Sequence, residues 1–304
     1  MMQVTHRPVV VGTVTLDVLR RGLDTADLRF GGVCNNVACA LGALGMSPRF
    51  VTATFSGDLG ELIPVHLERH GVEWHPLSTR APLAYYEAVL DASGEVSAER
   101  FFDTGSLNAI TAEALRMLSG VFVGAGAIVG CTDLADDAIQ MLQGVATDLS
   151  IPFFLASTSI QEIEKIHRLK RPVDLLGMNL TELRALASGS FPTHASILQV
   201  VSAFSAKYDA CLVTRGPDGA SLWTGRPHQF IEQAALPVTT RSVVGAGDVF
   251  FAGLVAAHLA GKPWQSAMAF GAAVVLAYLS HDASRLPFLA LRSLTDELWS
   301  GINR

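Results

Sequence analysis

The sequence VVGAGDVFFAGLVAAHL, residues 243–259, joins a glycine-rich loop to an apolar segment with helical spacing. Gly261 and Pro263 follow that segment and predict its end. Glycines let the backbone approach an anion closely, and the unpaired N–H groups of a first helical turn point toward it. We therefore expect a helix over 249–259 that begins at an anion-binding loop, Gly245-Ala246-Gly247.

Asp248 comes directly after this loop. A carboxylate at this position is placed to accept the proton of a hydroxyl that attacks phosphorus. The alternative is purely structural, because Asp is also a common N-terminal cap of a helix after a tight turn.

A second glycine-rich loop lies far upstream, at Gly31-Gly32-Val33-Cys34-Asn35-Asn36. An alanine-rich helix is expected after it, over 37–44, ended by Gly45. Asp17 follows the first predicted strand and is expected at the same edge of the fold. The structural alternative is a Gly-Gly turn with an Asn cap.

Short apolar runs rich in β-branched residues recur along the chain, and helical patterns separate most of them. This alternation predicts βαβ units, and therefore an α/β fold with a mainly parallel central sheet and helices on both faces. No linker-like segment interrupts it, so we expect one domain over 1–304. The predicted strands are 9–11, 50–53, 127–129, 153–155, 175–178 and 211–214.

One region departs from this alternation. Residues 84–90 and 95–102 read as two strands joined by Asp91-Ala92-Ser93-Gly94, a turn in which Gly adopts positive φ easily. Together with 15–30, this hairpin is expected to form a small β-lid, with lid segments at about 15–31 and 83–103. Ligands of open α/β sheets bind at the carboxyl edge of the strands, where such a lid excludes water.

The composition limits the classes of function. The 304 residues contain 22 Lys and Arg against 28 Asp and Glu, a net charge of −6, which argues against a nucleic-acid partner. The longest apolar stretches, 121–129 and 267–279, are shorter than the roughly 20 residues of a membrane span. The first residues show no signal-peptide pattern, so we expect a cytoplasmic protein. The four cysteines lack a Cys-x-x-Cys spacing and are expected to be reduced and buried.

Two weaker features are interpreted structurally. His66 and His70 lie on one face of a predicted helix, but the zincin spacing is absent, so we expect a solvated face rather than a metal site. Asp133 follows a strand and either faces the substrate or caps the next helix; we favour the cap.

These loops resemble the two signatures of the ribokinase-like (PfkB) family of carbohydrate and nucleoside kinases, and the resemblance covers essentially the whole chain. Five segments carry it: Gly31-Gly32-x-x-x-Asn36 with Leu44-Gly45, Ser56-Gly57-Asp58-Leu59-Gly60 with His70-Gly71-Val72, Asn179-Leu180-Thr181-Glu182, Thr214-Arg215-Gly216-Pro217-Asp218-Gly219, and Gly245-Ala246-Gly247-Asp248. Any single motif is weak, but five in the same order are specific.

The resemblance implies a ribokinase-like fold and transfer of the γ-phosphoryl group of ATP to a primary hydroxyl, with Mg²⁺ as cofactor. It implies Asp248 as the catalytic base, with Gly245, Ala246 and Gly247 as the anion hole. The implied substrate-binding residues are Asp17, Gly31, Gly32 and Asn36. The implied nucleotide-binding residues are Asn179, Glu182, Thr214, Gly216 and Gly219, with Glu182 organising Mg²⁺ through water.

Within the family the chain is most similar to the pseudouridine-kinase-like branch, through 85–95 and 107–113. Three departures matter. Thr15 stands where many relatives have Asn, Ala156-Ser157 replaces Asp-Pro, and Ser242-Val243 replaces Asp-Thr. The last change weakens the case for a monovalent-cation site, because a carboxylate ligand has become a hydroxyl.

The acceptor is therefore expected to be a small nucleoside, pseudouridine-like, that stacks on an aromatic residue of the lid such as Tyr85 or Phe101. The alternative acceptor is a free sugar, such as ribose, fructose or a keto-deoxy sugar acid, and converging Arg side chains such as Arg20 or Arg21 would favour the acid. A third alternative is a non-catalytic sugar or nucleoside sensor. We also expect a homodimer formed through the lid, because an exposed two-stranded sheet leaves edges that need covering.

Overall fold

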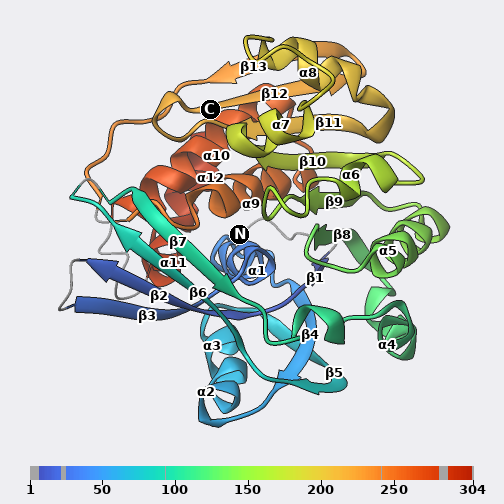
Figure 1. The fold of residues 1–304 in the computed structure, drawn as a ribbon, viewed down its shortest axis with the longest axis vertical. Coiled ribbons are helices and arrows are strands. Elements are labelled where there is room, and N and C mark those ends of the chain that lie inside the picture. Colours follow the sequence, from blue (N-terminus) through green and yellow to red (C-terminus); the bar gives the residue numbers. More distant parts are fainter. Residues whose placement is uncertain (1–6, 22–24, 93, 241, 281–286, 303–304) are drawn as a thin grey trace.

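The predicted strands form the core of a nine-stranded sheet with the order β13-β12-β11-β10-β9-β8-β1-β4-β5 (Figure 1). This computed structural model describes residues 7–21, 25–92, 94–240, 242–280 and 287–302. The nine strands are β1 (Arg7–Val11), β4 (Arg49–Phe55), β5 (Glu73–Ala81), β8 (Ala125–Cys131), β9 (Phe153–Ala156), β10 (Val173–Asn179), β11 (Tyr208–Thr214), β12 (Ala220–Gly225) and β13 (His228–Gln233).

The sheet is parallel from β5 to β11, and its last two strands turn back as antiparallel neighbours. The six predicted strands are all present. Strands β5, β12 and β13 were not predicted, because β5 contains a proline and β13 has an exposed, polar sequence. Edge strands of this kind lack the continuous apolar run of a buried parallel strand.

Helices cover both faces of the sheet, as predicted, and α9 packs against both α1 and α10 in the centre of Figure 1. The α9–α10 contact depends on small residues, since a Cβ on Gly253 would lie 3.0 Å from the Gly271 Cα. The helices are α1 (Val33–Ala43), α2 (Asp58–Glu61), α3 (Ile63–Arg69), α4 (Ala112–Met117), α5 (Asp136–Leu149), α6 (Lys165–Arg168), α7 (Leu180–Leu186), α8 (Ile197–Ala203), α9 (Ala246–Leu259), α10 (Trp264–Leu279), α11 (Pro287–Ser293) and α12 (Thr295–Ile302).

Both functional helices begin earlier than their apolar periodicity suggests. Helix α1 begins at Val33 rather than 37, and α9 begins at Ala246 rather than 249. The N-caps are Gly32 and Gly245, with φ of 95° and 86°. The interpretation of Asn36 as a cap is therefore wrong, because the residue lies inside the first turns of α1.

The predicted lid is a separate four-stranded sheet with the order β3-β2-β6-β7. Its strands are β2 (Thr15–Arg21), β3 (Thr25–Gly31), β6 (Ala84–Leu90) and β7 (Val96–Phe102). The hairpin β6–β7 is antiparallel as expected, and β2 pairs with β6 in parallel. Residue 93 of the predicted turn lies outside the described residues.

The register of the lid separates its side chains into two faces. Asp17 pairs with Arg29 on one side and Tyr86 on the other, and Tyr86 pairs with Phe101. Paired residues share a face of a sheet, so these four lie on one face, the inner face of the lid. Leu19, Ala88 and Leu90 form a small apolar cluster in the lid, and Val244 packs against this cluster. Alternate residues, Tyr85 among them, lie on the outer face.

Two sequence expectations about the chain as a whole have a structural outcome. All four cysteines are buried and free, as predicted. Among the described residues, no helix combines the length and the hydrophobicity that a membrane crossing requires.

Candidate active site

The two glycine-rich loops, distant in sequence, meet at the N-termini of α1 and α9. The Asn36 Nδ2 donates a hydrogen bond of 2.8 Å to the Asp248 Oδ2. Helix α1 packs directly on α9, and this contact brings the two loops together. The residues predicted separately from two motifs therefore belong to one site.

Gly245 has a conformation that other residues rarely adopt. Its φ of 86° places it in the left-handed region, and an added Cβ would lie 3.0 Å from the Tyr278 hydroxyl oxygen. Gly247, by contrast, has open space around it, with the nearest atom, the Thr214 Oγ1, 3.7 Å from an added Cβ. The N–H of Ala246 donates to the Val243 carbonyl at 3.0 Å, which closes the turn before the helix. The next two amides, of Gly247 and Asp248, lie in the first turn of α9, where N–H groups have no partner within the helix.

Asp248 is not the helix cap. It lies three residues after the N-cap Gly245, and its side chain makes no capping hydrogen bond. The carboxyl is deep in the molecule, and the residue keeps partial contact with a cavity. Burial raises the pKa of Asp248 to about 7, with smaller contributions from the negative charges of Asp17 and Glu182, while the Asn36 hydrogen bond opposes the shift. A carboxyl with a pKa near neutrality is suited to proton transfer.

Asp17 is buried at the junction of the lid and the sheet. Its Oδ1 accepts a hydrogen bond of 2.8 Å from the Thr15 hydroxyl, and its Oδ2 lies 3.6 Å from the Arg29 Nε. Burial raises the pKa of Asp17, and the Arg29 charge opposes this effect. An added Cβ on Gly31 would lie 2.1 Å from the Asp17 Oδ2, so only glycine leaves room for this carboxylate.

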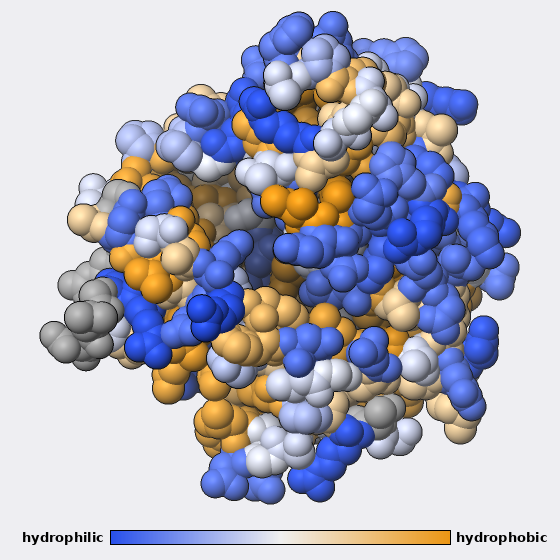
Figure 2. Space-filling view, viewed as in Figure 1, coloured by the Kyte–Doolittle hydropathy of each residue, from blue (hydrophilic) through white to orange (hydrophobic). Residues whose placement is uncertain are grey.

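A cavity of about 1070 Å³ adjoins Asp248. Figure 2 shows the molecular surface hollowed near the position of α9 in Figure 1. The Gly245–Asp248 loop and the β10 and β11 ends line one side, and the lid contributes Tyr86, Glu95 and Val96. An apolar wall comes from Phe250, Phe251, Ala272, Val275, Leu276 and Leu279. The cavity thus extends from the sheet edge to the inner face of the lid.

Asn179 and Glu182 both line the cavity and form a capping box at the start of α7. The Asn179 Oδ1 accepts from the Glu182 N–H at 2.8 Å, and the Glu182 Oε2 accepts from the Asn179 N–H at 2.9 Å. Burial raises the pKa of Glu182. Because one oxygen serves the cap, the carboxylate has its other oxygen to offer a metal-bound water, which fits a carboxylate that holds Mg²⁺ indirectly.

Thr214 ends β11, Gly216 and Gly219 follow it, and all three lie on the same cavity wall. Gly216 and Gly219 have φ of 58° and 87°, and an added Cβ on Gly219 would lie 2.0 Å from the Gln233 carbonyl oxygen. The two glycines therefore permit a tight turn against the loop that follows β13. This loop, residues 234–240, also lines the cavity.

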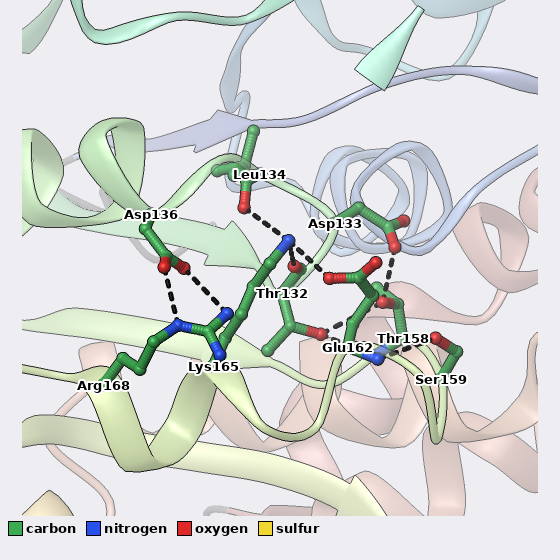
Figure 3. A network of polar contacts seen from close by, with 9 residues as sticks. All are labelled: Thr132, Asp133, Leu134, Asp136, Thr158, Ser159, Glu162, Lys165 and Arg168. Atoms are coloured by element: carbon green, nitrogen blue, oxygen red, sulfur yellow. Dashed lines mark hydrogen bonds and ion pairs between the residues drawn. The ribbon is translucent and has the colours of Figure 1, made fainter. Parts of the chain in front are cut away.

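Asp133 does not take the role that the sequence favoured. The N-cap of α5 is Ala135, so the favoured interpretation as a cap is wrong. The Asp133 Oδ1 accepts a hydrogen bond of 2.6 Å from Thr158, a cavity-lining residue (Figure 3). Lys165 donates to the carbonyls of Thr132 and Leu134 at 2.7 and 3.0 Å, which fixes the loop that carries Asp133. Asp133 thus holds the side chain of Thr158, a residue of the cavity wall, in position.

Three residues at the candidate site were not identified from the sequence: Arg29, Tyr86 and Tyr278. The Arg29 Nη2 and the Tyr278 hydroxyl both donate to the Val244 carbonyl at 3.1 Å. Arg29 could have been found from the lid segment 15–31, because it precedes Gly31 by two residues and therefore lies on the same face of that strand. Tyr278 had no local signal, since its position depends on how α10 packs on α9.

The arrangement suits transfer of a phosphoryl group to a hydroxyl. A glycine loop and the N-terminus of α9 offer N–H groups and a positive dipole end to an anion. A carboxyl with a raised pKa lies beside them, and a lid covers both. Preorganised donors in a water-excluded site stabilise the charge that develops during such a transfer.

Comparison with known proteins gives a consistent result. The sequence profile described as "pfkB family carbohydrate kinase" matches residues 9–286. A 2-dehydro-3-deoxygalactonokinase of Haloferax volcanii is 26% identical over 267 residues, covering 81% of this chain and 80% of the relative. A pseudouridine kinase of Escherichia coli K12 is 23% identical over 299 residues, covering 94% of each chain.

The fold has close structural neighbours. Arabidopsis thaliana ribokinase, solved with ribose and ATP, superposes with a TM-score of 0.77 at 20% identity, covering 97% of this chain and 98% of the ribokinase. The α/β fold with a mostly parallel sheet is therefore the ribokinase-like fold predicted from the motifs.

Proposed function

We propose that this chain, which belongs to the pfkB family of carbohydrate kinases, transfers the γ-phosphoryl group of ATP to a primary hydroxyl of a small polyol. Family membership makes the chain a phosphotransferase that acts on a hydroxyl group. The observation that carries the residue assignment is the Asn36–Asp248 hydrogen bond, which joins the acceptor loop to the phosphoryl loop.

ATP is proposed to occupy the cavity along β10 and β11. The apolar wall of α10 and the loop 234–240 suit the base, and the turn at Thr214, Gly216 and Gly219 suits the phosphates. Asn179 and Glu182 would hold Mg²⁺ through water, and the ion would neutralise charge on the phosphates when bound. Ser242 is buried and accepts from the Val244 N–H at 3.2 Å, so its hydroxyl is used within the loop rather than offered to a monovalent cation.

Asp248 is proposed as the general base. Its carboxylate accepts the proton of the acceptor hydroxyl as that oxygen bonds to the γ-phosphorus, and the bond to the β–γ bridging oxygen breaks to release ADP. The amides of Gly247 and Asp248, with Gly245 and Ala246 shaping the turn, stabilise the charge on the transferring group. Asp17, Gly31, Gly32 and Asn36 bind the hydroxyls of the acceptor.

The acceptor is proposed to be a ribonucleoside similar to pseudouridine. Tyr86 and Phe101 share the inner face of the lid with Asp17, and a ring there can stack on a planar base. The expected contact from Tyr85 is wrong, because Tyr85 lies on the outer face and stacks on Phe102 with centroids 4.2 Å apart. The relationship to a pseudouridine kinase over 94% of both chains supports this acceptor.

A second candidate acceptor is a keto-deoxy sugar acid, and the specific observation that favours it is Arg29. Its guanidinium lies between Asp17 and the Val244 carbonyl, where it can meet a carboxylate. The arginines named from sequence have other partners, since Arg20 pairs with Glu87 and Arg21 with Asp27. The relationship to a 2-dehydro-3-deoxygalactonokinase also supports an acidic acceptor.

The lid is proposed to form a homodimer through its outer face. Two apolar side chains of this face are exposed, Leu28 at 65% and Val89 at 36%. Covering them with the lid of a second copy would bury apolar surface and protect the edges of the small sheet. Sedimentation of the wild type and of Leu28→Glu tests this proposal, with loss of the dimer expected in the variant.

The proposed activity is tested by measuring ADP release with MgATP and a panel of pseudouridine, uridine, adenosine, ribose, fructose and a keto-deoxy sugar acid. We expect acceptor-dependent ADP release and a phosphorylated product. The highest kcat/KM identifies the acceptor class. Equal ADP release with and without every acceptor would contradict the proposal and favour a sensor.

A further inference from the structure

A cluster of three metal-ligating side chains lies beneath the lid, outside the catalytic cavity. Cys39 comes from α1, His66 from α3, and His70 is the C-cap residue directly after α3. Cys39 and His70 are buried and His66 is half-buried, so the expected solvated histidine face is wrong. The three ligand atoms lie within 4.8 Å of one another.

One hydrogen bond fixes the tautomer of His70. The His70 Nδ1 donates to the His66 carbonyl at 2.7 Å, which directs the lone pair to Nε2. A metal-bound histidine commonly donates its second ring N–H to a backbone carbonyl in this way.

One distance in the cluster matches an edge of a tetrahedral site. The Cys39 Sγ lies 3.5 Å from the His66 Nε2. Zinc bonds of about 2.3 Å to sulfur and about 2.0–2.1 Å to nitrogen, at a tetrahedral angle, give a separation of about 3.5 Å. The pair therefore already has the spacing that a shared zinc ion requires.

Asn35 supplies a fourth polar group. It is fully buried, and its Oδ1 lies 3.2 Å from the His66 Nε2 and 3.8 Å from the Cys39 Sγ. Its Nδ2 is buried without a partner among the described residues. The amide oxygen, the sulfur and the ring nitrogen therefore lie within hydrogen-bond distance of one another. The Asn35 Nδ2 is the group of this site that lacks a hydrogen-bond partner in the described part of the chain.

We propose that Cys39, His66 and His70 bind one zinc ion, with the Asn35 Oδ1 as the fourth ligand. Binding replaces the thiol proton, which passes to solvent, and the His66 ring proton moves from Nε2 to Nδ1, so that no electrons are transferred. Arg69 and Arg292 lie near His70, and their charges oppose a divalent ion, while the Cys39 thiolate offsets one of its charges. His66 is half-buried and gives the ion a route from solvent.

The ion would fasten α1 to α3. Asn36, the partner of Asp248, is adjacent to Asn35 on α1, so the metal would hold the first turn of the helix that carries the acceptor loop. Zinc binding at this cluster would require neither the acceptor nor ATP hydrolysis, and it can be followed by metal content and by stability.

The test uses the full chain without an affinity tag, treated with chelator, incubated with zinc and desalted. We expect one equivalent of bound zinc and a higher Tm than the zinc-free protein. Cobalt in place of zinc should give a thiolate charge-transfer band. Cys39→Ala and His66→Gln should each lower bound zinc at least tenfold and abolish the Tm increase.

Matched controls exclude general damage to the fold. Cys211→Ala removes another fully buried thiol, and His258→Gln removes another histidine whose pKa burial lowers. Both controls should keep one equivalent of zinc. Absence of bound zinc in the wild type overturns the proposal, and so does equal zinc in cluster and control variants, which identifies an adventitious ion only.

Discussion

Asn36 and Asp248, 212 residues apart in the chain, are joined by a hydrogen bond of 2.8 Å between the Nδ2 and the Oδ2. Each residue lies in the first turns of a helix whose N-cap is a glycine with positive φ, Gly32 for α1 and Gly245 for α9. The bond therefore couples the loop that would hold the acceptor to the carboxyl that would take its proton.

The pH dependence of kcat/KM should report the carboxyl. Asp248 is active as a base only when ionised, and its pKa is about 7, so kcat/KM should rise with pH and level off above about 7. Asn36 lowers this pKa by its hydrogen bond, so Asn36→Ala should move the acid limb to higher pH. A profile that is flat between pH 5 and 8 in the wild type would exclude Asp248 as the base.

Asp248→Asn should stabilise the protein at alkaline pH. A carboxyl with a folded-state pKa raised from 3.8 to about 7 binds more protons when folded, so stability falls as pH rises through this window. The neutral amide of the variant does not have this loss. We therefore expect the Tm of Asp248→Asn to exceed that of the wild type at pH 8 but not at pH 4. The difference at pH 8 should be about 2–4 °C for each kcal/mol of unfolding free energy that the variant retains. A lower Tm at both pH values would instead indicate a helix cap.

Substitution of the two loop glycines should have unequal effects. Gly245→Ala forces a side chain into a left-handed conformation, at a cost of about 1–2 kcal/mol, and places its Cβ 3.0 Å from the Tyr278 hydroxyl. We expect a Tm lower by several degrees and a reduced kcat. Gly247→Ala serves as the control, because its φ is ordinary and its nearest neighbour is 3.7 Å away. Equal losses of Tm would contradict the proposed role of the Gly245 conformation.

Arg29→Met should identify the acceptor class. The substitution keeps the apolar stem and removes the charge that faces Asp17 and Val244. For an acidic acceptor, loss of a charged hydrogen bond of about 1.5–3 kcal/mol should lower kcat/KM by about 10–150-fold. For a nucleoside the loss should be below about tenfold. Arg21→Met, whose guanidinium pairs with Asp27 on the same lid, is the control.

Much of the fold could be predicted from sequence, because buried parallel strands are continuous apolar runs and the lid hairpin has a clear turn. The starts of α1 and α9 could not be predicted. Each helix begins directly after a glycine N-cap, Gly32 or Gly245, and its first turn lies before the apolar periodicity begins. Strand β13 was hidden by the polar, exposed sequence of an edge strand.

The site was only partly predictable, for physical reasons. Motifs identified Asp248 and Asn36, but their hydrogen bond depends on the packing of α1 against α9. The inner position of Tyr86 and the outer position of Tyr85 depend on strand register, where a shift of one residue exchanges the faces. The burial of His66 and His70 depends on α1, which no pattern within α3 could show.

The most direct test of the central claim is single-turnover phosphoryl transfer from MgATP to the best acceptor, compared between the wild type and Asp248→Asn. The variant keeps the volume of the side chain and loses only the proton acceptor. We predict ATP affinity within about twofold of the wild type and a transfer rate lower by about 10²–10⁴. A transfer rate equal to that of the wild type would contradict the assignment of Asp248 as the base.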